Sequence, residues 1–79
     1  LDRVRHAEAF LMRLGFKQIR VRDHEGIARI EVLPEEKKTV LKNSAKIAGE
    51  LRKLGYRYIT LDLEGYRSGS MDEVLGIKK

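Results

Sequence analysis

Three arginines and one glutamate alternate with aliphatic residues in two short segments, where they could bind an anion. Arg20 and Arg22 lie in the first segment, and Arg29 and Glu31 lie in the second. Because successive side chains of a strand point to opposite faces, all four would share one face of a sheet. Guanidinium groups bind phosphate and carboxylate oxygens, so the pattern predicts an anion site, for example for the phosphate of a nucleotide-like substrate. The alternative is a solvated face of cross-strand ion pairs with Glu31.

A second candidate anion site is the run LDLEGYRSGS over residues 61–70. A strand end leads here into a stretch that contains two glycines together with Arg67, Ser68 and Ser70. Backbone donors, serine hydroxyls and the arginine could together hold a phosphate. The lysine and glycine spacing of a P-loop is absent, and a plain turn is the alternative.

Several carboxylates could bind Mg²⁺ or another divalent ion. Their spacing singles out no site, and most are expected to be ordinary surface groups. They are Glu8, Glu31, Asp62 and Glu64.

Apolar periodicity, glycines and one proline divide the chain into the helices and strands that must position these residues. The expected elements are a helix over residues 2–14, a hairpin of strands over 17–22 and 27–33 joined by a turn over 23–26, a second helix over 35–54 that could break at Asn43–Ser44, and a third strand over 56–63. Residues 64–79 are expected to be a loop or tail within a single domain that spans residues 1–79.

This order of elements, α-β-β-α-β, predicts an α+β fold. A small three-stranded sheet, made of the hairpin plus one strand, would pack on two helices and resemble a ferredoxin-like sheet without its first strand. An exposed edge of that sheet would need cover from another segment or another chain. The segment 11–19 also resembles the segment 51–59, at an offset of 40 residues, which indicates two helix–strand units lying side by side.

Composition excludes several classes of protein. Seventy-nine residues can build only one modest core. Hydrophobic residues make up 42% of the chain without an apolar run near the roughly 18 residues of a membrane span, so a soluble chain is expected. The absence of cysteine excludes disulfides, thiolate metal sites and a cysteine nucleophile within the chain. A signal peptide is also absent, which favours a cytoplasmic location.

The chain carries a formal net charge of +5, which favours an anionic partner such as phosphate, a nucleotide or nucleic acid. A solvated surface with a mild excess of lysine is the simpler interpretation, since small domains commonly carry such a charge.

Two stretches together resemble the C-terminal region of LarE-type proteins, the ATP-dependent sacrificial sulfur transferases of the PP-loop ATP pyrophosphatase superfamily. The first combines the RVR of residues 20–22 with the ARIEV of residues 28–32, and the second is the LDLEGYRSGSM of residues 61–71. The resemblance implies an N-terminal PP-loop domain that binds ATP and Mg²⁺ and adenylylates a substrate carboxylate. It also implies that the C-terminal region helps to bind the substrate.

The resemblance further implies roles for individual residues. Arg20 and Arg22 would hold the phosphate of the substrate, which in the family's nickel-pincer cofactor pathway is a pyridinium dicarboxylate mononucleotide. Glu8 and Glu31 resemble family carboxylates that can bind a divalent metal, and Glu35 or Glu36 could supply a third. In the family, sulfur comes from a cysteine of the enzyme or from an iron–sulfur cluster.

The chain departs from the family pattern in two respects, since it has neither an SGGxDS motif nor a cysteine. It therefore cannot activate a substrate with ATP or donate sulfur alone. Because Leu1 lies inside a helical pattern, we expect a C-terminal fragment of a longer PP-loop protein; the alternative is a homologue that acts with a PP-loop partner chain. A homo-oligomer is also expected. The rival functions are a basic RNA-binding module and an oligomerisation domain that uses the open sheet edge.

Overall fold

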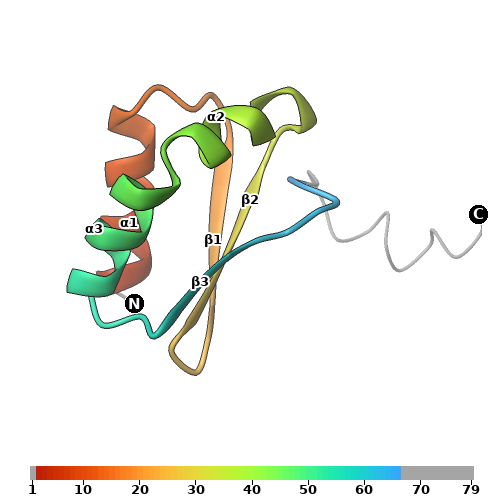
Figure 1. Cartoon of the computed structure of the whole chain (residues 1–79). Helices are drawn as coiled ribbons and strands as arrows, with labels where there is room; N and C mark the ends of the chain where they lie inside the picture. Colours follow the sequence, from red (N-terminus) through yellow and green to blue (C-terminus); the bar gives the residue numbers. More distant parts are fainter. Residues whose placement is uncertain (1, 67–79) are drawn as a thin grey trace, which may run out of the picture.

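The computed structural model describes residues 2–66 and confirms the α+β class with the predicted order of helices and strands (Figure 1). The second predicted helix is divided into a 3-10 turn and two short helices, with the break at Asn43. The elements are α1 (Asp2–Arg13), β1 (Ile19–His24), β2 (Ile27–Val32), η1 (Pro34–Glu36), α2 (Lys37–Lys42), α3 (Ser44–Lys53) and β3 (Tyr58–Leu61). None of these helices has the length and apolar character needed to cross a bilayer.

The hairpin turn is tighter than the sequence predicted. Strand β1 continues to His24, so only Glu25 and Gly26 lie between the strands. Both have positive φ, 51° and 93°, which defines a type I′ turn. This turn matches the right-handed twist of the strands, which explains why pairing extends through Asp23 and His24.

The sheet is mixed and has the strand order β1-β2-β3. Strand β1 runs antiparallel to β2, with Val21 opposite Ile30, and β3 runs parallel to β2, with Leu61 beside Ile30. Strand β3 therefore pairs directly with β2. The arrangement differs in this respect from a ferredoxin-like sheet, in which a further strand splits the βαβ unit.

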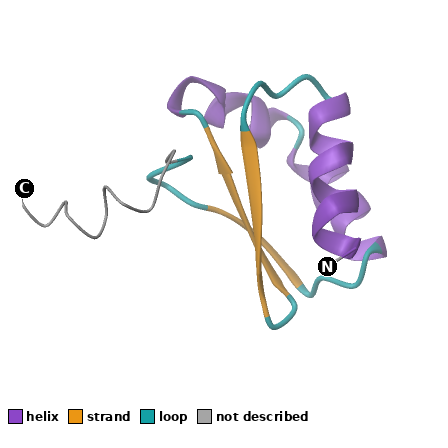
Figure 2. Cartoon of the chain, turned by 180° about the vertical axis from the view of Figure 1, so that it is seen from behind, coloured by secondary structure: helices purple, strands orange, loops and turns teal. Residues whose placement is uncertain are grey.

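Helices α1 and α3 lie on one side of the sheet, where they pack against β1 and β3, and η1 and α2 follow at the end of β2 (Figures 1 and 2). The core forms between these layers. Its buried members are Ala7, Leu11, Phe16, Val21, Ala28, Ile30, Val32, Val40, Ile47, Leu51 and Tyr56. No helix or strand among residues 2–66 covers the opposite face of the sheet, so charged side chains of the strands can face solvent there.

The internal repeat corresponds to two matching units, α1–β1 and α3–β3, that flank β2. Each helix is followed by a glycine with φ near +105°, Gly15 or Gly55, and then by a buried aromatic residue, Phe16 or Tyr56. A left-handed glycine ends each helix and turns the chain back to the sheet. The repeat therefore reflects the same helix-to-strand turn used twice.

Candidate functional site

The four residues of the predicted anion site share the open face of the sheet. Arg20 and Arg22 lie on β1, and Arg29 and Glu31 lie on β2. Among their immediate neighbours along the strands, those buried in the core on the helix side are Val21, Ala28, Ile30 and Val32. By strand alternation these charged side chains point away from the helices. We call this set of four residues the arginine face.

Strand register brings the arginine face together. Arg20 is the cross-strand partner of Glu31, and Arg22 is the partner of Arg29. The Nη2 atom of Arg29 donates a hydrogen bond of 3.0 Å to Oε2 of Glu31, and Nε of Arg22 lies 3.4 Å from the same oxygen. Asp62 directly follows β3, the strand that pairs with the other edge of β2, and its Oδ2 lies 3.6 Å from Nε of Arg29. Three guanidinium groups and two carboxylates leave one positive charge in excess.

The guanidinium groups of the arginine face keep hydrogen-bonding capacity. The side chains of Arg22 and Arg29 are 42% and 38% exposed. Their Nε atoms are buried and lie within ion-pair distance of carboxylates, but neither makes a hydrogen bond. An arginine has five N–H donors, and the ion pairs with Glu31 and Asp62 use few of them. An anion approaching from solvent would find donors already gathered at one place.

Tyr66 also supports the arginine face, and no local pattern in the sequence predicted this contact. The guanidinium carbon of Arg20 lies 5.6 Å from the centroid of the Tyr66 ring, a distance at which a cation is attracted by the ring. The backbone N–H of Tyr66 donates to the carbonyl of Val32 at the end of β2, at 2.7 Å. The ring therefore limits where the Arg20 side chain can move.

A tight turn after β3 places Tyr66 there. The N–H groups of Glu64 and Gly65 donate to the side chain and the backbone carbonyl of Asp62, at 2.9 and 3.1 Å. Lys37 of α2 donates a hydrogen bond to the carbonyl of Leu63. Gly65 has a φ of +86°, and a Cβ there would lie 2.6 Å from the Val32 carbonyl oxygen. Only glycine fits this approach, and it was the sequence signal for the turn.

The remaining candidate residues of the predicted second anion site, Arg67, Ser68 and Ser70, lie outside the described residues. The described chain ends at Tyr66, beside Arg20.

The carboxylates predicted to bind a metal have separate partners. Oε2 of Glu8 accepts a hydrogen bond of 2.9 Å from the backbone N–H of Val21, whereas Glu31 lies against arginines. Both carboxylate oxygens of Glu36 accept from the N–H of Lys17, at 3.3 and 3.0 Å. Within residues 2–66 no three His, Asp or Glu side chains gather closely enough to hold a metal ion. These residues by themselves therefore do not fit a metal, which would need ligands from beyond the described part of the chain.

A different ion pair fixes α1 to the sheet on the helix side. Nε of Arg3 donates to Oδ2 of Asp23 at 2.7 Å, and the guanidinium carbon of Arg3 lies 4.5 Å from the centroid of the Tyr56 ring. The hydrogen bond from Arg3, followed by that from the Gly26 N–H, lowers the pKa of Asp23. Burial raises the pKa of the Tyr56 hydroxyl. This cluster connects the start of α1 with the hairpin turn and has a structural role.

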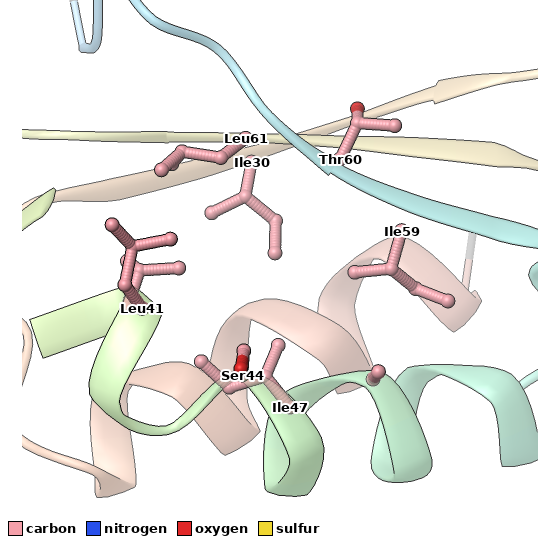
Figure 3. A pocket seen from close by; sticks show the side chains of 9 residues that line it. Ile30, Leu41, Ser44, Ile47, Ile59, Thr60 and Leu61 are labelled. Atoms are coloured by element: carbon pink, nitrogen blue, oxygen red, sulfur yellow. The ribbon is translucent and has the colours of Figure 1, made fainter.

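A pocket of about 260 Å³ opens between α2, α3 and β3 (Figure 3). Its lining includes Leu41, Ile47 and Ile59, with Ser44 and Thr60 as the polar members. No charged side chain lines it, so it does not match the predicted anion.

Comparison with known proteins supports the resemblance found in the sequence. No protein-family model matches the chain. The chain is 47% identical over 76 residues to the pyridinium-3,5-bisthiocarboxylic acid mononucleotide synthase of Lactiplantibacillus plantarum. It is 42% identical over 77 residues to an uncharacterised protein of Synechocystis. Each match covers 95% of this chain but only 27% and 29% of the relatives. The chain thus spans less than a third of the curated relatives, and its predicted similarity to the C-terminal region of a LarE-type protein is confirmed.

Proposed function

We propose that this chain is the substrate-binding domain of an ATP-dependent sulfur transferase and that the arginine face holds a phosphorylated carboxylate substrate. The observation that carries the proposal is the register of β1 and β2, which gathers three arginines around one buried glutamate on the open face. The similar synthase is named for a mononucleotide with two thiocarboxylates. Phosphate and carboxylate groups are the anions that guanidinium groups bind best.

The domain's contribution would be positioning. A substrate anchored by its phosphate presents its carboxylate in a fixed orientation, which replaces a random encounter with an effectively intramolecular one. ATP and Mg²⁺ would be bound by a PP-loop domain in the same chain or in a partner chain. A cytoplasmic location, a homo-oligomer, and a divalent metal at Glu8 and Glu31 with further ligands from elsewhere remain predictions.

Calorimetric titration with nicotinic acid mononucleotide tests the proposal, because this ligand combines a phosphate with a pyridine carboxylate. We expect Arg22→Ala to weaken binding by about tenfold to a hundredfold, since a hydrogen bond to a charged group contributes about 1.5–3 kcal/mol. Arg5→Ala is the matched control: it removes the same charge from an exposed position of α1, on the other side of the sheet. Equal affinities of the two variants would contradict the proposal.

Binding of single-stranded RNA is the second candidate function, favoured by one observation. Tyr58 of β3 is 63% exposed and, by strand alternation, shares the open face with the arginines. Exposed aromatic rings beside arginines can stack bases. The RNA function predicts affinity for an oligonucleotide that falls steeply between about 50 and 200 mM salt and weakens in Tyr58→Ala. An RNA affinity that stays the same in Tyr58→Ala would exclude base stacking on Tyr58.

A further inference from the structure

Glu31 is the one buried charged residue among residues 2–66, with 2% of its surface exposed. It lies at the centre of a positively charged surface. A carboxylate removed from water is costly unless it is paired with positive groups. Here the pairing comes from the same arginines that are proposed to bind the substrate.

The pairing is concentrated on a single atom. Oε2 of Glu31 lies 3.0 Å from Nη2 of Arg29 and 3.4 Å from Nε of Arg22. Arg22 and Arg29 are cross-strand partners, and two like charges in that relation repel each other. The glutamate therefore compensates for the repulsion between the two arginines and holds both guanidinium groups at one place before any ligand binds.

We propose that Glu31 is an internal counter-anion that competes with the anionic group of the substrate for Arg22 and Arg29. This inference rests on the proposed function of the arginine face. A ligand phosphate that approaches these two guanidinium groups also approaches the negative charge of Glu31. The carboxylate thus stabilises the empty site and weakens the occupied one. Its role is to keep the arginines assembled while limiting how tightly the anion is held.

The position of Glu31 favours this role over that of a metal ligand within the described chain. Its Oε2 faces two cations, and no two further acidic or histidine side chains among residues 2–66 stand close to it. A metal ion placed at Oε2 would lie beside two guanidinium charges. A counter-anion role needs no group beyond those the structure shows.

Substitution of Glu31 by glutamine tests the inference, because glutamine keeps a carbonyl acceptor for Arg29 and removes only the charge. We expect Glu31→Gln to bind inorganic phosphate about tenfold more tightly at low salt. That factor follows for a phosphate dianion about 6 Å from the removed charge in a water-like dielectric. A merely structural role of Glu31 would not raise the affinity. Circular dichroism would establish that the variant is folded.

A charge-balanced double variant keeps the test valid if Glu31→Gln alone fails to fold. Arg29→Gln should bind phosphate more weakly than the parent chain. Adding Glu31→Gln should bring the affinity back to within about threefold of the parent, because the local charge is then restored. An unchanged or weaker affinity in folded Glu31→Gln, or no recovery in the double variant, would overturn the inference.

Titration with Mn²⁺ adds an independent arm. If Glu31→Gln abolishes Mn²⁺ binding and leaves phosphate affinity unchanged, Glu31 is a metal ligand and the counter-anion role is wrong. If the arginine face does not bind the anion of the substrate, a different result is expected: Arg22→Ala does not weaken phosphate binding. That result overturns both proposals, whereas a loss in Arg22→Ala without a gain in Glu31→Gln overturns only the role of Glu31.

Discussion

The guanidinium group of Arg20 on β1 lies against the ring of Tyr66, 5.6 Å from its centroid, although the two residues are far apart in the sequence. The contact exists because residues 62–66 turn back across the end of β2, where the Tyr66 N–H reaches the Val32 carbonyl. The segment after β3 thus becomes part of the same surface as the hairpin. It joins the two stretches that carry the resemblance to the sulfur transferases.

Removal of the Tyr66 ring should weaken anion binding by the arginine face. A cation over an exposed aromatic ring contributes about 0.5–1 kcal/mol, so Tyr66→Leu should lower the affinity for nicotinic acid mononucleotide about two- to fivefold. Tyr66→Phe keeps the ring and should bind like the parent chain in the same calorimetric titration. A loss of affinity in Tyr66→Phe equal to that in Tyr66→Leu would show that the hydroxyl, and not the ring, supports the site.

Replacement of Gly65, in the turn after β3, should destabilise the fold. Gly65→Ala combines a left-handed φ with a methyl group 2.6 Å from the Val32 carbonyl oxygen, so we expect a loss of about 1–3 kcal/mol in the free energy of unfolding. Gly49→Ala is the control, because Gly49 lies in α3 and a methyl group there would meet no neighbouring atom within 4 Å. Alanine there should stabilise the protein by about 0.5–1 kcal/mol. Urea titrations with equal effects on both variants would contradict this description of the turn.

Acid should weaken the attachment of α1 to the sheet through Asp23. The pKa of Asp23 is lowered in the folded protein by its hydrogen bonds with Arg3 and Gly26. A carboxyl group of this kind stabilises the fold above its unfolded pKa of about 3.9, and the stabilisation is lost as the pH falls towards the folded pKa. Thermal unfolding temperatures measured from about pH 6 to pH 2 should therefore fall less steeply below about pH 4 in Asp23→Asn than in the parent. Parallel profiles would rule out this linkage.

Alkali should destabilise the fold through Tyr56. Its pKa is raised because burial disfavours the phenolate. Above about pH 10 the Tyr56 hydroxyl keeps its proton in the folded state and releases it in the unfolded state. The free energy of unfolding is therefore unaffected by this group below about pH 10 and falls as the pH rises above that value. Tyr56→Phe should lack most of this alkaline decline in the unfolding temperature. A decline of the same size in Tyr56→Phe would assign it to other groups.

Apolar periodicity, glycines and one proline predicted the helices and strands of this fold because these signals depend on residues close together in the sequence. Alternation placed Arg20, Arg22, Arg29 and Glu31 on one face, and the same rule placed their neighbours in the core. The boundaries were less accurate. Strand β3 ends at Leu61 and not at residue 63, because the turn at Gly65 begins with Asp62.

Contacts between distant segments could not be predicted in the same way. The hydrogen bond of Glu8 to the N–H of Val21 and the contact of Tyr66 with Arg20 join residues from separate elements. No local spacing encodes them. Glu8 also shows why residue type alone is ambiguous, since its carboxylate satisfies a backbone donor of β1 where a metal ligand was predicted.

Binding of a phosphorylated carboxylate by the arginine face can be observed directly by nuclear magnetic resonance of the ¹⁵N-labelled 79-residue chain. Nicotinic acid mononucleotide would be titrated while the backbone amide signals are followed. We predict that the largest shifts fall in residues 20–22 and 29–31, with little change in α1 and α3, and that Arg22→Ala needs about ten to a hundred times more ligand to reach the same shifts. Shifts centred on the apolar pocket around Leu41 and Ile59, or no shifts at millimolar ligand, would contradict binding at the arginine face.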